Sequence, residues 1–236
     1  IYDEEIPVSI LLISYRLINI IFFVVLIFVT DFLLARKRII KKISLIIILI
    51  FSLVFTSLKP YLHFSTNFNS LRNNLGKSLS TEHAVIYYSN KIKDENKIKL
   101  IGIMHDYFYE QIKDELKLKS KQKIVSFIFY DEEEKKKLFG SAKADVSKPW
   151  LRQIYVDYNS YTHTLKHEIV HALSSEFGTT IFMVNKNFNP AVIEGLAMAI
   201  ENNFDDYPIH YPAKIANESG IKVQMKKLFS GFNFFT

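Results

Sequence analysis

The chain has 236 residues, a formal net charge of +6 and no cysteine. Without cysteine it can form neither a disulfide nor a thiolate metal site. Residues 1–59 carry 7 Lys and Arg against 4 Asp and Glu, and residues 60–236 carry 23 against 20. Such a dispersed excess indicates a solvated surface rather than a phosphate-binding stripe, so we expect no nucleic-acid partner.

Two apolar runs near the start predict a membrane hairpin over residues 1–59. Residues 10–34 are long enough to cross a bilayer, whereas residues 43–58 would reach about 24 Å as a helix, which is slightly short. Between them lies the basic segment ARKRIIKK. Because positive loops stay in the cytoplasm, we expect a multi-pass protein in the lipid bilayer whose remaining domain is extracytoplasmic. A signal peptide or buried core helices would explain this pattern less well.

The rest of the chain predicts a mixed α+β domain. Residues 60–80 are polar and read as a juxtamembrane linker, and residues 81–236 form the domain. We expect strands at 83–88, 124–130 and 153–158, a long helix at 94–118, and a short solvated helix at 131–138. The Phe-rich end, LFSGFNFFT, carries no stop signal, so we expect the domain to be truncated at its C-terminus.

The stretch LKHEIVHALSSEFG contains His167, Glu168 and His171 in the order H-E-x-x-H. Residues four apart lie on one face of a helix, so both imidazoles can bind one ion. Glu168 lies about 100° around the helix, where it can take a proton from a water that the metal acidifies. The apolar residues of this stretch would form its buried back. Two ordinary surface histidines are the alternative.

A third ligand is offered by NPAVIEGLAMAIENN, in which Pro190 suits the first turn of a helix and Glu194 follows in the second. Twenty-two residues separate His171 from Glu194, which allows the second helix to return beside the first. The small residues Gly195, Ala197 and Ala199 would permit close approach. Two histidines and one carboxylate leave a fourth position open, as in catalytic Zn²⁺ sites. A solvated carboxylate is the alternative for Glu194.

HEIVH followed by EGLA resembles the gluzincin zinc metallopeptidases, and in particular the peptidase MA-like domains of bacterial membrane proteins. The resemblance implies a zincin-like fold with zinc ligands His167, His171 and Glu194, and Glu168 as general base. In thermolysin-like relatives a carboxylate four residues after the third ligand orients the first histidine. Here that position is Met198. Glu201, one turn further on, is a possible substitute.

Other residues near the motif leave alternatives open. His163 lies four residues before His167, and we expect it at the rim of the site rather than among the ligands. Tyr207, His210 and Tyr211 are candidates for the donor that stabilises the oxyanion, but the sequence does not choose among them. Residues 153–158 could be the sheet edge to which a peptide adds as a further strand, or an ordinary internal strand.

These observations predict a membrane-anchored, zinc-dependent peptidase acting on a peptide or protein substrate. The alternatives are a catalytically inactive zinc-binding domain that serves as a binding or accessory module, and the accessory domain of a channel or transporter. The sequence specifies neither the substrate nor the oligomeric state.

Overall fold

The described residues, taken from a computed structural model, are 10–34, 46, 48, 50, 52–57, 66–178, 190–204 and 207–221. They fall into two compact units, Ile1–Leu71 and Arg72–Thr236.

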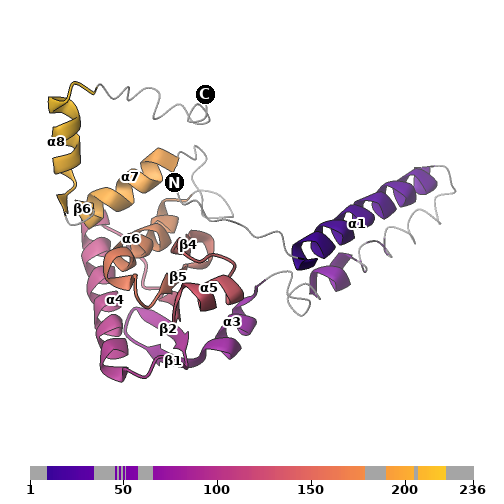
Figure 1. Ribbon diagram of the computed structural model, residues 1–236, viewed down its shortest axis with the longest axis horizontal. Coiled ribbons are helices and arrows are strands. Elements are labelled where there is room, and N and C mark those ends of the chain that lie inside the picture. Colours follow the sequence, from indigo (N-terminus) through magenta and orange to yellow (C-terminus); the bar gives the residue numbers. More distant parts are fainter. Residues whose placement is uncertain are drawn as a thin grey trace. The chain divides into compact units, whose positions relative to one another are not determined.

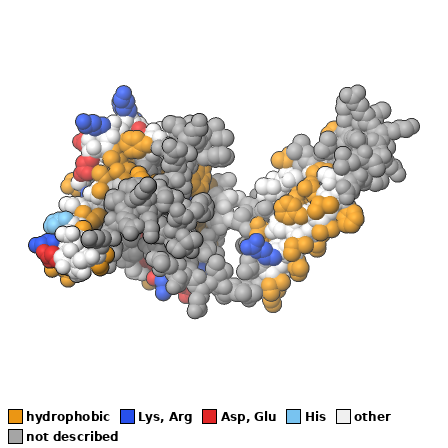
Figure 2. All heavy atoms as spheres, turned by 90° about the horizontal axis from the view of Figure 1, so that it is seen from above, with side chains coloured by type: hydrophobic (Ala, Val, Ile, Leu, Met, Phe, Trp, Pro, Cys, Tyr) orange, Lys and Arg blue, Asp and Glu red, His pale blue; other side chains and the backbone are white. Residues whose placement is uncertain are grey.

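The first unit contains the long apolar helix α1 (Ile10–Leu34). Its window Ile13–Thr30 has a mean hydropathy of 2.2, and none of that window is buried. Figure 2 shows the apolar side chains that dominate its surface. The ring of Phe22 stacks on that of Phe55, with centroids 5.8 Å apart, so the described part of the second run lies beside α1. The basic segment and the remainder of the second run lie outside the described residues. One helix is therefore long and apolar enough to span a membrane.

The segment expected to be a linker is largely structured. Helix α3 (Phe68–Leu75) is followed directly by strand β1 (Gly76–Ser80). Leu71 and Leu75 are buried. Gly76, directly after the helix, has the left-handed backbone conformation (φ +80°) that glycine adopts easily and that commonly ends a helix. The prediction of a linker over residues 60–80 is thus wrong for residues 68–80. Although most of their neighbours are polar, Leu71 and Leu75 are spaced so that both can be buried on one side of a helix.

A five-stranded mixed sheet forms the centre of the second unit (Figure 1). Its order is β1-β2-β3-β5-β4, with parallel pairing among the three central strands and antiparallel pairing at both edges. The remaining strands are β2 (Ala84–Ser89), β3 (Ile124–Phe129), β4 (Val146–Lys148) and β5 (Gln153–Asp157). The expectation of a mixed α+β domain is confirmed.

Strand β5 is not a sheet edge. Ile154 of β5 is opposite Ser126 of β3 on one side and opposite Ser147 of β4 on the other. The suggestion that residues 153–158 form the edge is therefore wrong, and β4 takes that place. Only three residues long and followed by Pro149, β4 is too short to show an alternating pattern in the sequence.

Helices α4 (Glu95–Leu116) and α6 (Tyr161–Ser174) cover one face of the sheet. Ile154 and Val156 of β5 join Leu165 and Ile169 of α6 in the buried core. On the opposite face Tyr155 stacks between Phe127 and Phe139. Because side chains alternate along a strand, β5 serves both cores.

The short helix α5 (Glu132–Leu138) is capped by Asp131, whose side chain accepts a hydrogen bond from the backbone N–H of Glu134. It was expected to be wholly solvated. Lys135, however, is completely buried and paired with Asp145. The local pattern of charges could not reveal this, since the partner comes from a different segment.

After α6 the chain passes through a 3₁₀ turn (Ser175–Phe177) and returns as α7 (Pro190–Glu201). The strands β6 (Asn203–Phe204) and β7 (Tyr207–Pro208) form a small second sheet, followed by α8 (His210–Glu218). A further 3₁₀ turn, η1 (Pro149–Leu151), joins β4 to β5. Helix α7 packs against α6, and this contact assembles the site.

Candidate metal centre

The two histidines of the H-E-x-x-H sequence project from one face of α6. Their Nε2 atoms lie 3.0 Å apart, and His171 is the more buried of the two. Behind them, Leu165, Ile169, Ala172 and Leu173 are each at most 1% exposed. The apolar side of α6 therefore anchors the helix against the sheet and leaves the imidazoles facing the other way.

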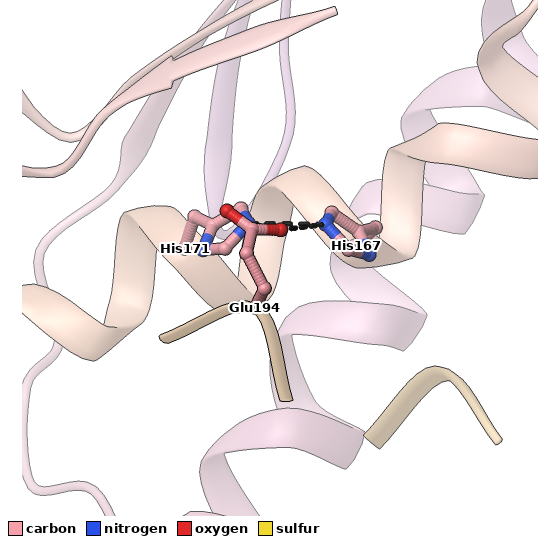
Figure 3. A group of neighbouring side chains, drawn as sticks. All are labelled: His167, His171 and Glu194. Carbon is pink, nitrogen blue, oxygen red and sulfur yellow. Dashed lines mark hydrogen bonds and ion pairs between the residues drawn. The ribbon is translucent and has the colours of Figure 1, made fainter. Parts of the chain in front are cut away.

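Helix α7 brings a carboxylate to this pair. Oε2 of Glu194 lies 3.3 Å from Nε2 of His167 and 3.5 Å from Nε2 of His171 (Figure 3). Ala197 is fully buried where the two helices meet, whereas Gly195 and Ala199 are exposed. The side chain of Glu194 is 59% exposed, so it lies at an open side of the group.

The three groups suit a zinc ion. All their ligand atoms lie within 4.8 Å of one another. Ligands at about 2.0–2.1 Å from a tetrahedral zinc ion are about 3.3 Å apart, which matches the spacings found here. Two imidazole nitrogens and one carboxylate oxygen are also a donor set typical of catalytic zinc, which keeps a fourth position open. The structure thus brings together all three residues that the sequence predicted as ligands.

Without a metal, the acidic and basic members of the group stabilise each other. Hydrogen bonds with Glu194 and then Glu201 raise the pKa of His167 to about 10. Hydrogen bonds with His167 and then His171 hold the pKa of the Glu194 carboxyl well below its usual range. A metal ion must displace the proton of His167, because only a neutral imidazole can be a ligand.

Glu168 lies beside this group and not within it. It is 7% exposed, and burial raises the pKa of its carboxyl to about 7. Among the described residues, none forms a hydrogen bond with this carboxylate. Its position on α6 follows from the helical offset that the sequence predicted, and its oxygens remain available to accept a proton.

A second carboxylate contacts the far side of His167. Oε2 of Glu201, at the end of α7, lies 3.1 Å from Nδ1 of His167. This is the contact suggested for Glu201 in place of Met198. An acceptor at Nδ1 orients the ring and leaves Nε2 directed at the metal position.

The other candidates lie outside the metal group. His163 is exposed on the first turn of α6. Tyr207 and Tyr211 are exposed and stack on each other, with centroids 5.5 Å apart, and His210 is exposed at the start of α8. The oxyanion donor stays unassigned.

No family model, curated protein or solved structure matches this chain.

Proposed function

We propose that the chain is a membrane-anchored zinc-dependent peptidase of the gluzincin type. The observation that carries the proposal is the convergence of His167, His171 and Glu194, from two helices, beside the buried Glu168, whose carboxylate forms no hydrogen bond within the described residues. A structural zinc site would have no use for such a carboxylate. A metal that activates water requires a base of this kind next to it.

Each residue has a separate role in this reaction. Zinc held by His167, His171 and Glu194 would polarise a water molecule and the scissile carbonyl. Glu168 would accept a proton from that water and deliver it to the departing amine, a role that suits a buried carboxylate beside the ligands. Glu201 keeps the ring of His167 in place through Nδ1.

The substrate would lie along β4. This strand is at the sheet edge within the described part of the chain, and it packs beside α6. An extended peptide can add to such an edge through main-chain hydrogen bonds, which bind many sequences equally well. This arrangement supports a peptide or protein as the substrate.

Cleavage of a mixed-sequence peptide library by the purified full chain tests the proposal. We expect cleavage that a chelator abolishes and that zinc restores. The variant Glu168→Gln should retain zinc but lose cleavage by at least about a hundredfold, since proton transfer by a positioned group contributes about 10²–10⁴-fold. Zinc binding without any cleavage by the wild type would instead favour the alternative of an inactive zinc-binding module.

We further propose a two-span anchor with the peptidase domain outside the cytoplasm, supported by α1, by the second apolar run and by the basic segment between them. The absence of native cysteine allows a direct test. A membrane-impermeant maleimide should label Ile103→Cys in intact cells, because Ile103 is 66% exposed on the domain. Ile39→Cys, within the basic segment, should be labelled only after permeabilisation. The opposite labelling pattern would show that the domain lies in the cytoplasm and the basic segment outside it.

A further inference from the structure

Asp145 connects four separate parts of the second unit through one carboxylate. It directly precedes the edge strand β4, and its side chain is only 2% exposed. Oδ1 accepts from the Lys135 ammonium of α5 and, at 3.1 Å, from the backbone N–H of Asp157 at the end of β5. Oδ2 accepts from the hydroxyls of Ser160 and Thr164.

The two hydroxyls belong to the start of the metal helix. Ser160 is the N-cap residue of α6, yet its side chain makes no capping hydrogen bond and donates to Asp145 instead, at 2.6 Å. Thr164 lies one turn further on. An anion near a helix N-terminus is also favoured by the helix dipole. Asp145, the residue directly before β4, is therefore bonded to the first turn of α6.

This link is on the same side of α6 as the proposed base. Thr164 and Glu168 are four residues apart, so their side chains lie one above the other. The Asp145 carboxylate approaches Glu168 closely enough to contribute to its electrostatic environment. A shift of Thr164 relative to Asp145 would rotate or tilt α6 and would move Glu168 relative to β4.

We propose that Asp145, acting through Thr164 and Ser160, is a positioning residue that sets the distance between Glu168 and a peptide bound along β4. The inference rests on the proposed peptidase function. Buried groups with every hydrogen bond satisfied hold a geometry better than apolar contacts do, and a displacement of about 1 Å at a reacting centre can lower a rate by about a hundredfold. Asp145 forms hydrogen bonds with none of the metal ligands, and His167 and His171 move together with α6, so zinc affinity should change much less than kcat.

The test compares Thr164→Val with Thr164→Ser in the full chain reconstituted in nanodiscs. Valine keeps the shape of threonine and removes the hydroxyl, whereas serine keeps the hydroxyl. An internally quenched peptide that the wild type cleaves serves as substrate, and kcat is expressed per bound zinc. We expect Thr164→Val to lower kcat by about tenfold or more, while KM and zinc affinity change less than about threefold. Thr164→Ser should keep kcat close to that of the wild type, because the hydroxyl is retained.

Two further variants separate positioning from stability. Ser126→Ala removes another buried hydroxyl, one that has no hydrogen-bond partner within the described residues, and should leave kcat unchanged. Ser160→Ala removes the second hydroxyl bonded to Asp145 and serves if Thr164→Val does not fold. A kcat per bound zinc within twofold of the wild type in the folded variant would overturn the inference and leave the peptidase assignment intact. Absence of zinc-dependent cleavage by the wild type would overturn both.

Discussion

Glu201 at the end of α7 contacts the imidazole of His167 on the side opposite to Glu194. The carboxylate lies 3.1 Å from Nδ1 of the imidazole, although it follows Glu194 by seven residues and not by four. Two turns of α7 separate the two carboxylates, so both lie on the face directed at α6. Met198 occupies the intermediate turn.

Removing the charge of Glu201 should weaken zinc binding. For Glu201→Gln we expect a loss of about 10–100-fold in zinc affinity, because the acceptor that orients a ligating imidazole also raises its basicity. Competition with a chromogenic chelator measures this affinity. Glu218→Gln is the control, since Glu218 is an exposed carboxylate on α8 that pairs only loosely with Lys214, at 3.9 Å. Equal affinities for the two variants would remove Glu201 from the site.

His163 and His167, which lie four residues apart on α6, should differ completely in their effect on the metal. We expect His167→Ala to lose both stoichiometric zinc and cleavage, because a catalytic site retains only three protein ligands. His163→Ala, exposed on the same helix, should retain both. Metal content after gel filtration distinguishes the variants. Full zinc occupancy in His167→Ala would show that the ligand assignment is incorrect.

Removing one partner of the buried pair of Lys135 and Asp145 should be strongly destabilising. Lys135→Met leaves a buried carboxylate without its cation, and breaking such a pair costs about 3–5 kcal/mol. Lys137→Met changes an exposed lysine two residues further along α5 and should cost less than about 0.5 kcal/mol. Urea denaturation of both variants measures the free energies of unfolding. A similar small cost for both would show that the Asp145 carboxylate does not depend on the Lys135 ammonium in the folded state.

His105 should make the folded state sensitive to acid. It is fully buried in α4, its Nδ1 lies 2.7 Å from the carbonyl oxygen of Ile101, and burial lowers its pKa to about 4. Between that value and the ordinary pKa near 6.5, the unfolded chain binds a proton that the folded chain does not. This contribution to stability is therefore fully present above pH 6.5 and falls as the pH drops towards 4, by about 3 kcal/mol in total.

The variant His105→Leu isolates this effect. The free energy of unfolding of the wild type minus that of the variant should fall by about 3 kcal/mol on going from pH 7 to pH 4. Denaturation is measured with a chelator present, so that loss of zinc does not contribute. His210→Gln, an exposed histidine, should follow the wild type at every pH. A constant difference between wild type and His105→Leu would argue against a neutral buried histidine.

Much of the candidate site could be predicted from the sequence because its logic is local. Helical periodicity alone places His167 and His171 on one face and Glu168 beside them, and the apolar pattern identifies the buried back of α6. The chemistry of the donor set then makes Glu194 the natural third ligand. The apolar run of α1 was equally evident, because length and hydropathy are properties of a single segment.

The tertiary structure decided whatever depends on segments distant in the sequence. The pairing of β5 with β4 makes β4 the edge strand, and no local pattern in three residues could indicate this. From the sequence, the run of charged residues around Lys135 is expected to be solvated. The structure shows that Lys135 is buried against Asp145. Likewise, only the packing of α7 on α6 brings Glu201 to His167. The type of each element thus follows from the periodicity of its own residues. Its neighbours follow from close packing between elements, and that packing depends on residues from the entire domain.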